Sequence, residues 1–216
     1  MSAAGPPGTR QDGGARILPE VPMVSTPRRA PYRLSTRSLL VIAAFAALGA
    51  LLLVLVSPAT ALLAAAFPPA YALAAGMHSI LPFLARRLVG FPWTTTIDFA
   101  LVGILTIGFT PLGALILVPL VVTGAAFDVT LLLLARRRPL RAGHTVVGAL
   151  VTAVLLFVIS LPVFSPHDLT PTILVLTFAG RVLGQLAAAG IARSVGSRVL
   201  RAGIVPPGPG VDASVR

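Results

Sequence analysis

One long apolar stretch limits the folds open to this chain more than any other feature. It runs from Trp93 to Ala135, and its only charged residues are Asp98 and Asp128. A single helix of that length would measure roughly 60 Å, about twice the ~30 Å hydrocarbon core of a bilayer. The stretch must therefore reverse once, and residues 108–111 (Gly-Phe-Thr-Pro) suit a reversal because glycine ends helices and proline begins them. The prediction is a membrane hairpin with one aspartate on each arm.

The composition places the whole chain in the same class. Of its 216 residues, 56% are hydrophobic and 11% are charged, which is typical of a polytopic membrane protein. The net charge of +11 comes from arginine alone, and nearly all of these arginines stand at the ends of apolar segments. The charge therefore indicates topology rather than nucleic-acid binding. The chain has no cysteine, which excludes a disulfide framework and a cysteine metal site.

The apolar segments divide the chain into three regions. Residues 1–33 are rich in Gly, Pro, Ser and Arg, so we expect a disordered cytoplasmic tail. Residues 34–204 are predicted to form a six-helix transmembrane domain, and residues 205–216 a flexible cytoplasmic tail. Helix breaks are expected at Ser57-Pro58 and Pro68-Pro69, with residues 60–67 as a short loop or half-helix. The predicted spans are 38–56, 70–87, 94–107, 111–135, 145–163 and 171–191.

The distribution of arginine predicts the orientation of these spans. Arginines cluster before the first span, between the second and third, between the fourth and fifth, and after the sixth, whereas the other three connections have none. The positive-inside rule then places both termini in the cytoplasm. The predicted fold class is an all-α protein with six transmembrane helices. Its alanine-rich, arginine-only usage is typical of GC-rich bacterial genomes, so the expected location is a bacterial plasma membrane.

Few polar side chains fall inside the predicted spans. Counted from the arginine-marked ends, they could form one polar layer in the bundle interior, and buried carboxylates are candidates for functional sites. In one interpretation Arg181 pairs with one aspartate and the other is protonated or hydrogen-bonded, which makes an internal clamp. In the other, an unmatched carboxylate binds a cationic or hydrogen-bond-donating ligand. The residues of the layer are His78, Asp98, Asp128, Arg181 and Gln185.

The sequence lacks the motifs of several enzyme classes. It has no Walker A sequence, no GxSxG, no HExxH and no repeated aspartate metal motif. We therefore expect no enzymatic activity, no cofactor and no metal. Six spans without an obvious inverted repeat also disfavour a self-sufficient secondary transporter.

The chain resembles the substrate-binding S component of an energy-coupling factor (ECF) vitamin transporter. The shared features are six spans, cytoplasmic termini, an alanine-lined first span and the lack of an energy motif. Within this family it is most similar to the YkoE-like branch, which is associated with thiamine or its hydroxymethylpyrimidine precursor. At both aspartate positions the branch tends to carry glutamate. The resemblance covers about residues 34–204 and is carried by TTTIDFALVGIL, TGAAFDVTLLLLARR and FAGRVLGQLAAAGIARSVGSRVLRAGI.

The resemblance implies partners and a binding site. The partners are a transmembrane coupling subunit and two ATPase subunits, and the expected interface with the coupling subunit is the small-residue face formed by Ala43, Ala47 and Ala50. A thiazolium cation or an aminopyrimidine would suit a surplus carboxylate beside an aromatic ring. Two other functions remain open, an autonomous small-solute permease and a membrane scaffold whose buried charges lock its helices. The expected ligand-binding residues are Tyr71, His78, Trp93, Asp98, Asp128, Arg181 and Gln185.

Overall fold

The computed structural model describes residue 5 and residues 34–110, 112–136, 142–163 and 170–203. Apart from Gly5, both expected tails lie outside the described residues. The described part contains α-helices and short 3-10 helices and no strand. The α-helices are α1 (Thr36–Ala66), α2 (Pro68–Met77), α3 (Ile80–Val89), α4 (Thr94–Thr106), α5 (Leu117–Ala135), α6 (Ala142–Ser160) and α7 (Pro171–Arg201).

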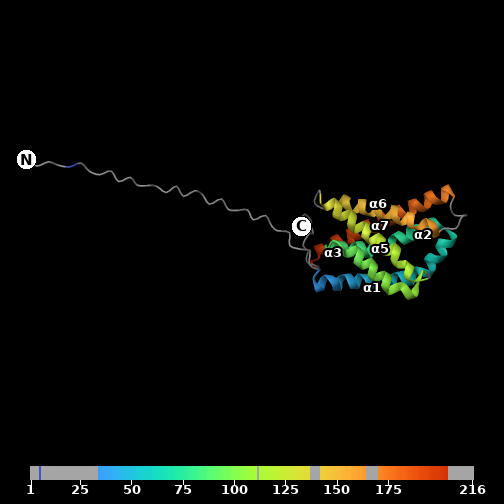
Figure 1. Ribbon diagram of the computed structural model, residues 1–216, viewed down its shortest axis with the longest axis horizontal. Helices are drawn as coiled ribbons and strands as arrows, with labels where there is room; N and C mark the ends of the chain where they lie inside the picture. The colour runs from blue at the N-terminus through green and yellow to red at the C-terminus, as the bar shows by residue number, and fades with distance from the viewer. Residues whose placement is uncertain (1–4, 6–33, 111, 137–141, 164–169, 204–216) are drawn as a thin grey trace, which may run out of the picture. The chain divides into compact units, whose positions relative to one another are not determined.

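These helices cross the bundle six times, because α2 and α3 together make one crossing (Figure 1). The start of α1 and the end of α7 lie at the same end of the bundle, on the left in Figure 1. Within the described ranges, four segments are long and apolar enough to cross a membrane: α1, Gly113–Ala135, α6 and α7; Thr94–Phe109 is a shorter apolar helix. The predicted all-α, six-span architecture is confirmed, and the side of the membrane on which the ends lie stays a prediction.

The predicted break at Ser57-Pro58 is wrong, because α1 continues through Pro58 to Ala66. Proline removes one backbone donor and so leaves a carbonyl of the preceding turn without its usual partner. The hydroxyl of Thr60 donates to Val56 O at 3.2 Å and to Ser57 O at 3.0 Å beside the proline. These bonds do not reach the Val54 carbonyl, which loses its donor to Pro58, but they reinforce the helical turn around the proline, and membrane helices accommodate proline with the help of such Ser and Thr side chains. Residues 60–66 are therefore helix rather than loop.

The second span is also different from the prediction, because it is divided into α2 and α3 at His78 and Ser79. Pro82, the third residue of α3, explains the position of the break. A proline ring in a continuous helix clashes with the carbonyl four residues earlier, which here belongs to His78. The chain instead makes tight turns, in which Ser79 N–H donates to Gly76 O at 3.2 Å.

The central hairpin reverses close to the predicted position, but α5 begins at Leu117 rather than at residue 111, and Pro111 itself lies outside the described residues. The 3-10 helices Ile107–Phe109 and Gly113–Ile116 stand between α4 and α5, and Gly113 has the positive φ of 54° that favours glycine. The remaining spans are shifted or longer than predicted. Helix α6 ends at Ser160, followed by the 3-10 helix Leu161–Val163, and α7 continues ten residues past the predicted end at residue 191.

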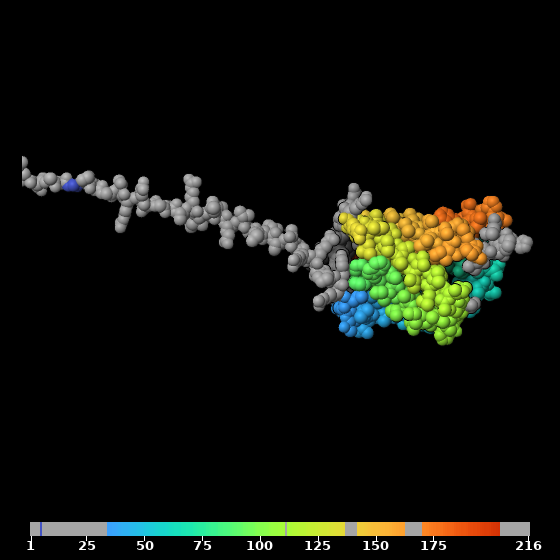
Figure 2. Space-filling view, in the orientation of Figure 1, coloured from blue at the N-terminus to red at the C-terminus, as the bar shows by residue number. Residues whose placement is uncertain are grey.

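The helices pack in a ring in which each helix contacts the next and the last returns to the first ones. Helix α1 packs against α2, α3 and α4; α4 packs against α5, α5 against α6, and α6 against α7, which returns to α2 and α3. Figure 2 shows side chains of α4, α5 and α6 adjoining one another on one face of the bundle. The exposed side chains of α6 are largely valine and leucine, as a lipid-facing surface requires.

Candidate functional site

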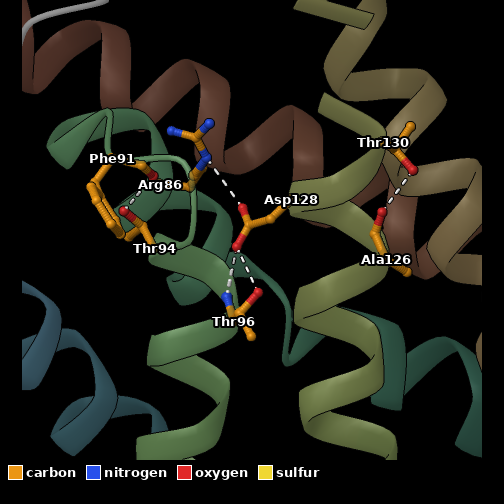
Figure 3. Close-up of polar contacts among 7 residues, drawn as sticks. All are labelled: Arg86, Phe91, Thr94, Thr96, Ala126, Asp128 and Thr130. Carbon is orange, nitrogen blue, oxygen red and sulfur yellow. Dashed lines mark hydrogen bonds and ion pairs between the residues drawn. The ribbon is translucent and has the colours of Figure 1, made fainter. Parts of the chain in front are cut away.

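Asp128 on α5 is fully buried and has partners on two other helices (Figure 3). Its Oδ2 accepts hydrogen bonds from the backbone N–H of Thr96 at 2.8 Å and from the Thr96 hydroxyl at 2.9 Å. Its Oδ1 lies 3.2 Å from Nε of Arg86 on α3. Because N–H groups in the first turn of a helix lack intrahelical partners, the carboxylate also caps α4. We call Arg86, Thr96 and Asp128 the clamp.

The packing around the clamp brings its three helices together. A Cβ atom on Gly124, one turn before Asp128, would lie 2.7 Å from the Cα atom of Thr96, so glycine is required for α5 to approach α4. The rings of Phe83 and Phe127 stack with centroids 4.0 Å apart and join α3 to α5. Arg87 donates from Nη2 to the Ser197 hydroxyl on α7 at 2.9 Å. Arg86 therefore joins α3 to α5, and the adjacent Arg87 joins α3 to α7.

The clamp corrects one interpretation of the sequence. An internal clamp exists, but Arg86 forms it, whereas Arg181 has no carboxylate within ion-pair distance among the described residues. Sequence reasoning treated Arg86 only as a marker of the cytoplasmic end of a span. A long arginine side chain at a helix end can nevertheless extend along its neighbours, so Arg86 and Asp128 can meet near that end of the bundle.

Asp98 on α4 contrasts with Asp128. It is fully buried, and neither carboxylate oxygen has a hydrogen-bond partner in the described part of the chain. Asp98 is thus the one carboxylate of the predicted layer that stays unmatched in the described structure.

A second group of polar side chains lies along one face of α7. Thr177, Arg181 and Gln185 are spaced by four residues, and each is at most 3% exposed. Among the described residues, no partner contacts the Thr177 hydroxyl, Arg181 Nε, or either the nitrogen or the oxygen of the Gln185 amide. The Arg181 guanidinium carbon lies 5.7 Å from the centroid of the half-buried Tyr71 ring on α2. We call Thr177, Arg181 and Gln185 the α7 row.

Glycines position the α7 row against α2. A Cβ atom on Gly184 would lie 2.5 Å from the carbonyl oxygen of Leu73, and one on Gly76 would lie 2.7 Å from the backbone of Gly184. A Cβ atom on Gly180 would similarly lie 2.6 Å from the carbonyl oxygen of Pro69. The two helices therefore run parallel in backbone contact. The sequence signal for this contact is the G-x-x-x-G pattern at Gly180 and Gly184, which was not among the predicted packing faces.

An apolar cluster separates the α7 row from the clamp. Ala188, Ala189 and Ala192 follow Gln185 along the buried side of α7, and they pack with Phe83 and Phe127. Phe127 directly precedes Asp128, so the cluster stands between the two polar groups. The prediction of one polar layer is therefore wrong, because the polar residues form separate groups at different levels of the bundle.

His78 and Trp93 occupy other positions. The Nδ1 atom of His78 lies 3.3 Å from Ala75 O, at the break between α2 and α3. His78 also borders a cavity of about 10 Å³ with Phe99 and Val102, a volume near the lower limit for one water molecule. Trp93 precedes α4, and 42% of its surface is exposed. In this structure Trp93 therefore lies at the surface rather than among the buried polar residues.

The predicted interface on α1 divides between two faces. Ala43 and Ala47 are exposed, whereas Ala50 is 8% exposed and packs with Ala46 and Val102 in the core. Ala50 therefore supports the bundle itself, and only Ala43 and Ala47 remain available to a partner. The described residues contain no group of three or more His, Cys, Asp or Glu side chains arranged for a metal ion.

Comparison with known proteins gives a structural relative. No protein-family model and no curated protein sequence matches the chain. A solved structure described as "Crystal structure of an S-component of ECF transporter" has a similar fold, with a TM-score of 0.70. The superposition covers 80% of this chain and 88% of that chain at 18% sequence identity. At that identity the likeness establishes a shared fold.

Proposed function

We propose that this protein is the substrate-binding membrane subunit of an ECF-type transporter. The observation that carries the proposal is the similarity of its fold to an ECF S component over most of both chains. Its segments of membrane-spanning length and its buried polar side chains agree with a small membrane subunit that binds a solute. In this role it would reside in a bacterial plasma membrane and act with a coupling subunit and two ATPase subunits.

The proposed substrate is thiamine or its hydroxymethylpyrimidine precursor. An unmatched carboxylate on Asp98 supports a ligand that is cationic or donates hydrogen bonds. The Tyr71 ring beside the α7 row offers an aromatic face of the kind that binds planar heterocycles. Asp128 has a weaker claim to the ligand than the sequence predicted, because Arg86 and Thr96 already occupy its oxygens.

Copurification tests the proposed role. The tagged full chain would be co-expressed with the coupling subunit and the two ATPase subunits, extracted in mild detergent, and examined for a stable complex. We expect all four polypeptides to elute together and thiamine uptake into cells to require ATP hydrolysis. Uptake by the chain alone would instead support an autonomous permease. Failure to bind either the subunits or a ligand would support a scaffold.

Two matched substitutions on α1 test the interface. Phenylalanine at the exposed positions Ala43 and Ala47 is expected to abolish copurification and leave the isolated subunit folded, because both side chains face away from the core. The control is Ala61→Phe, at an exposed position further along the same helix. Loss of the complex in the control alone would locate the interface elsewhere on α1.

A further inference from the structure

We propose that the α7 row recognises the ligand by its uncharged hydrogen-bonding edge, with Gln185 as the specificity-determining residue. This inference rests on the proposed function and names the part of the substrate that the protein reads. The observation behind it is that several buried polar atoms on α7 have no hydrogen-bond partner in the described part of the chain. Three successive turns of one helix face carry buried polar groups, and among the described residues no hydrogen-bond partner is found for the Thr177 hydroxyl, Arg181 Nε or either polar atom of the Gln185 amide.

Burial without partners is costly. A buried donor or acceptor without a hydrogen bond costs about 1–3 kcal/mol, and the Gln185 amide alone has one atom of each kind in this state. The buried hydroxyls of Thr106 and Thr152 donate to carbonyl oxygens of their own helices, Thr106 to Val102 O at 2.8 Å and Thr152 to Gly148 O at 2.7 Å. The α7 row is therefore not explained by a shortage of partners in membrane helices generally. A ligand that supplies the missing partners explains it.

The chemistry of the row defines the ligand. The amide of Gln185 can donate from nitrogen and accept at oxygen, so it matches an edge with an acceptor next to a donor. Glutamine pairs with adenine in this way, through a ring nitrogen and an amino group, and an aminopyrimidine presents the same edge. Arg181 offers only donors and a positive charge, so it favours ligand acceptors and disfavours a neighbouring cation.

The hydrogen-bonding groups of the α7 row favour one half of thiamine over the other. The aminopyrimidine half has the edge that Gln185 can read, and it can stack on an aromatic ring such as that of Tyr71. The thiazolium half is cationic and has no such edge, so Arg181 would oppose it at the row. We therefore infer that the protein binds the aminopyrimidine group and that the thiazolium group adds little affinity.

The surroundings of the row indicate the direction of access. On the far side of Gln185, the apolar cluster with the Phe83–Phe127 stack fills the interior and the clamp lies beyond it. The glycine contacts bring α2, along its whole length, against the first half of α7 beside the row. The ligand would accordingly enter from the end of the bundle where α2 and α7 begin, which is opposite to the ends of α3 and α5.

Calorimetry on the detergent-purified full chain tests the inference with three probes: thiamine, hydroxymethylpyrimidine and the thiazole half as its N-methylated hydroxyethylthiazolium cation. We expect hydroxymethylpyrimidine to bind within about tenfold of thiamine and the thiazole half not to bind. Gln185→Leu is expected to weaken binding of the first two roughly tenfold to a hundredfold, the usual discrimination of a lost bidentate pair. Thr177→Val should weaken it less, and Thr152→Val, whose hydroxyl bonds within α6, should leave it unchanged.

The outcomes separate this inference from the proposed function. Binding of thiamine without competition by hydroxymethylpyrimidine, or binding unaffected by Gln185→Leu, would overturn the inference and leave the transporter subunit intact. If neither probe binds to folded protein that still forms the four-subunit complex, the inference and the proposed substrate fail together, and the role as a transporter subunit stands. If no complex forms either, the proposed function fails with it. Circular dichroism of each variant confirms that a loss of binding is not a loss of fold.

Discussion

The clamp and the α7 row are both polar groups buried in an apolar bundle, and they differ in whether their atoms are satisfied. In the clamp, Oδ2 of Asp128 accepts two hydrogen bonds from Thr96 and Oδ1 faces Arg86. In the α7 row, the free atoms have no partners within the described residues. The difference teaches that burial alone does not identify a binding site. Polar groups that pair with one another support the fold, whereas Thr177 and Gln185, whose side chains have no hydrogen-bond partner among the described residues, are candidates to bind a ligand.

The largest expected effect follows from breaking the clamp. Arg86→Leu would leave the Asp128 carboxylate buried without its ion-pair partner, and such losses cost about 3–5 kcal/mol. We expect the free energy of unfolding in detergent to fall by an amount near this range, measured by chemical denaturation. Replacing both Arg86 and Asp128 by leucine should cost less than the sum of the two single changes. If either single substitution left the free energy of unfolding unchanged, the clamp would not support the fold and would no longer differ from the α7 row in that respect.

The next effect tests the packing that holds the row. Gly184→Ala would place a Cβ atom 2.5 Å from the Leu73 carbonyl oxygen, and relieving that overlap must move backbone, at a cost of about 1–3 kcal/mol. The control is Gly190→Ala on the same helix, where a Cβ atom meets nothing within 4 Å. There alanine should be neutral or slightly stabilising, because it favours helix more than glycine does. Equal thermal stability of the two variants would contradict the close contact of α2 and α7.

The two groups also differ in how far the sequence predicted them. Apolar run lengths and the arginine pattern predicted the six spans, because a bilayer demands spans of a certain length. Asp98, Asp128, Arg181 and Gln185 were singled out correctly as buried. Their partners were not predicted, since pairing depends on helix rotation and on glycine contacts between helices. Prolines were misjudged in both directions: Pro58 does not end α1, whereas the unremarked Pro82 divides the second span.

A smaller effect of opposite sign is expected within the row. Without ligand, Gln185→Leu removes a buried donor and a buried acceptor that lack partners, so we expect the free energy of unfolding to rise by about 1 kcal/mol. Gln185→Leu would then stabilise the protein while it weakens binding, a trade-off that is common at functional sites. Thermal unfolding without hydroxymethylpyrimidine measures the stability of the free protein, and the same measurement with it shows how much the ligand stabilises each variant. A loss of stability in the ligand-free protein would show that Gln185 has a structural partner.

The smallest expected effect concerns the two aspartates, which share a hairpin but not an environment. Asp128→Asn keeps the shape of the side chain yet weakens its contact with Arg86, so it should lower the free energy of unfolding measurably. Asp98→Asn removes no hydrogen bond seen in the described structure, so we expect a change of less than about 1 kcal/mol. If Asp98→Asn destabilises as much as Asp128→Asn, then Asp98 also belongs to the support of the fold. If it is neutral for stability but weakens thiamine binding, then Asp98 joins the α7 row in serving the ligand, and the unmatched groups of both helices have one explanation.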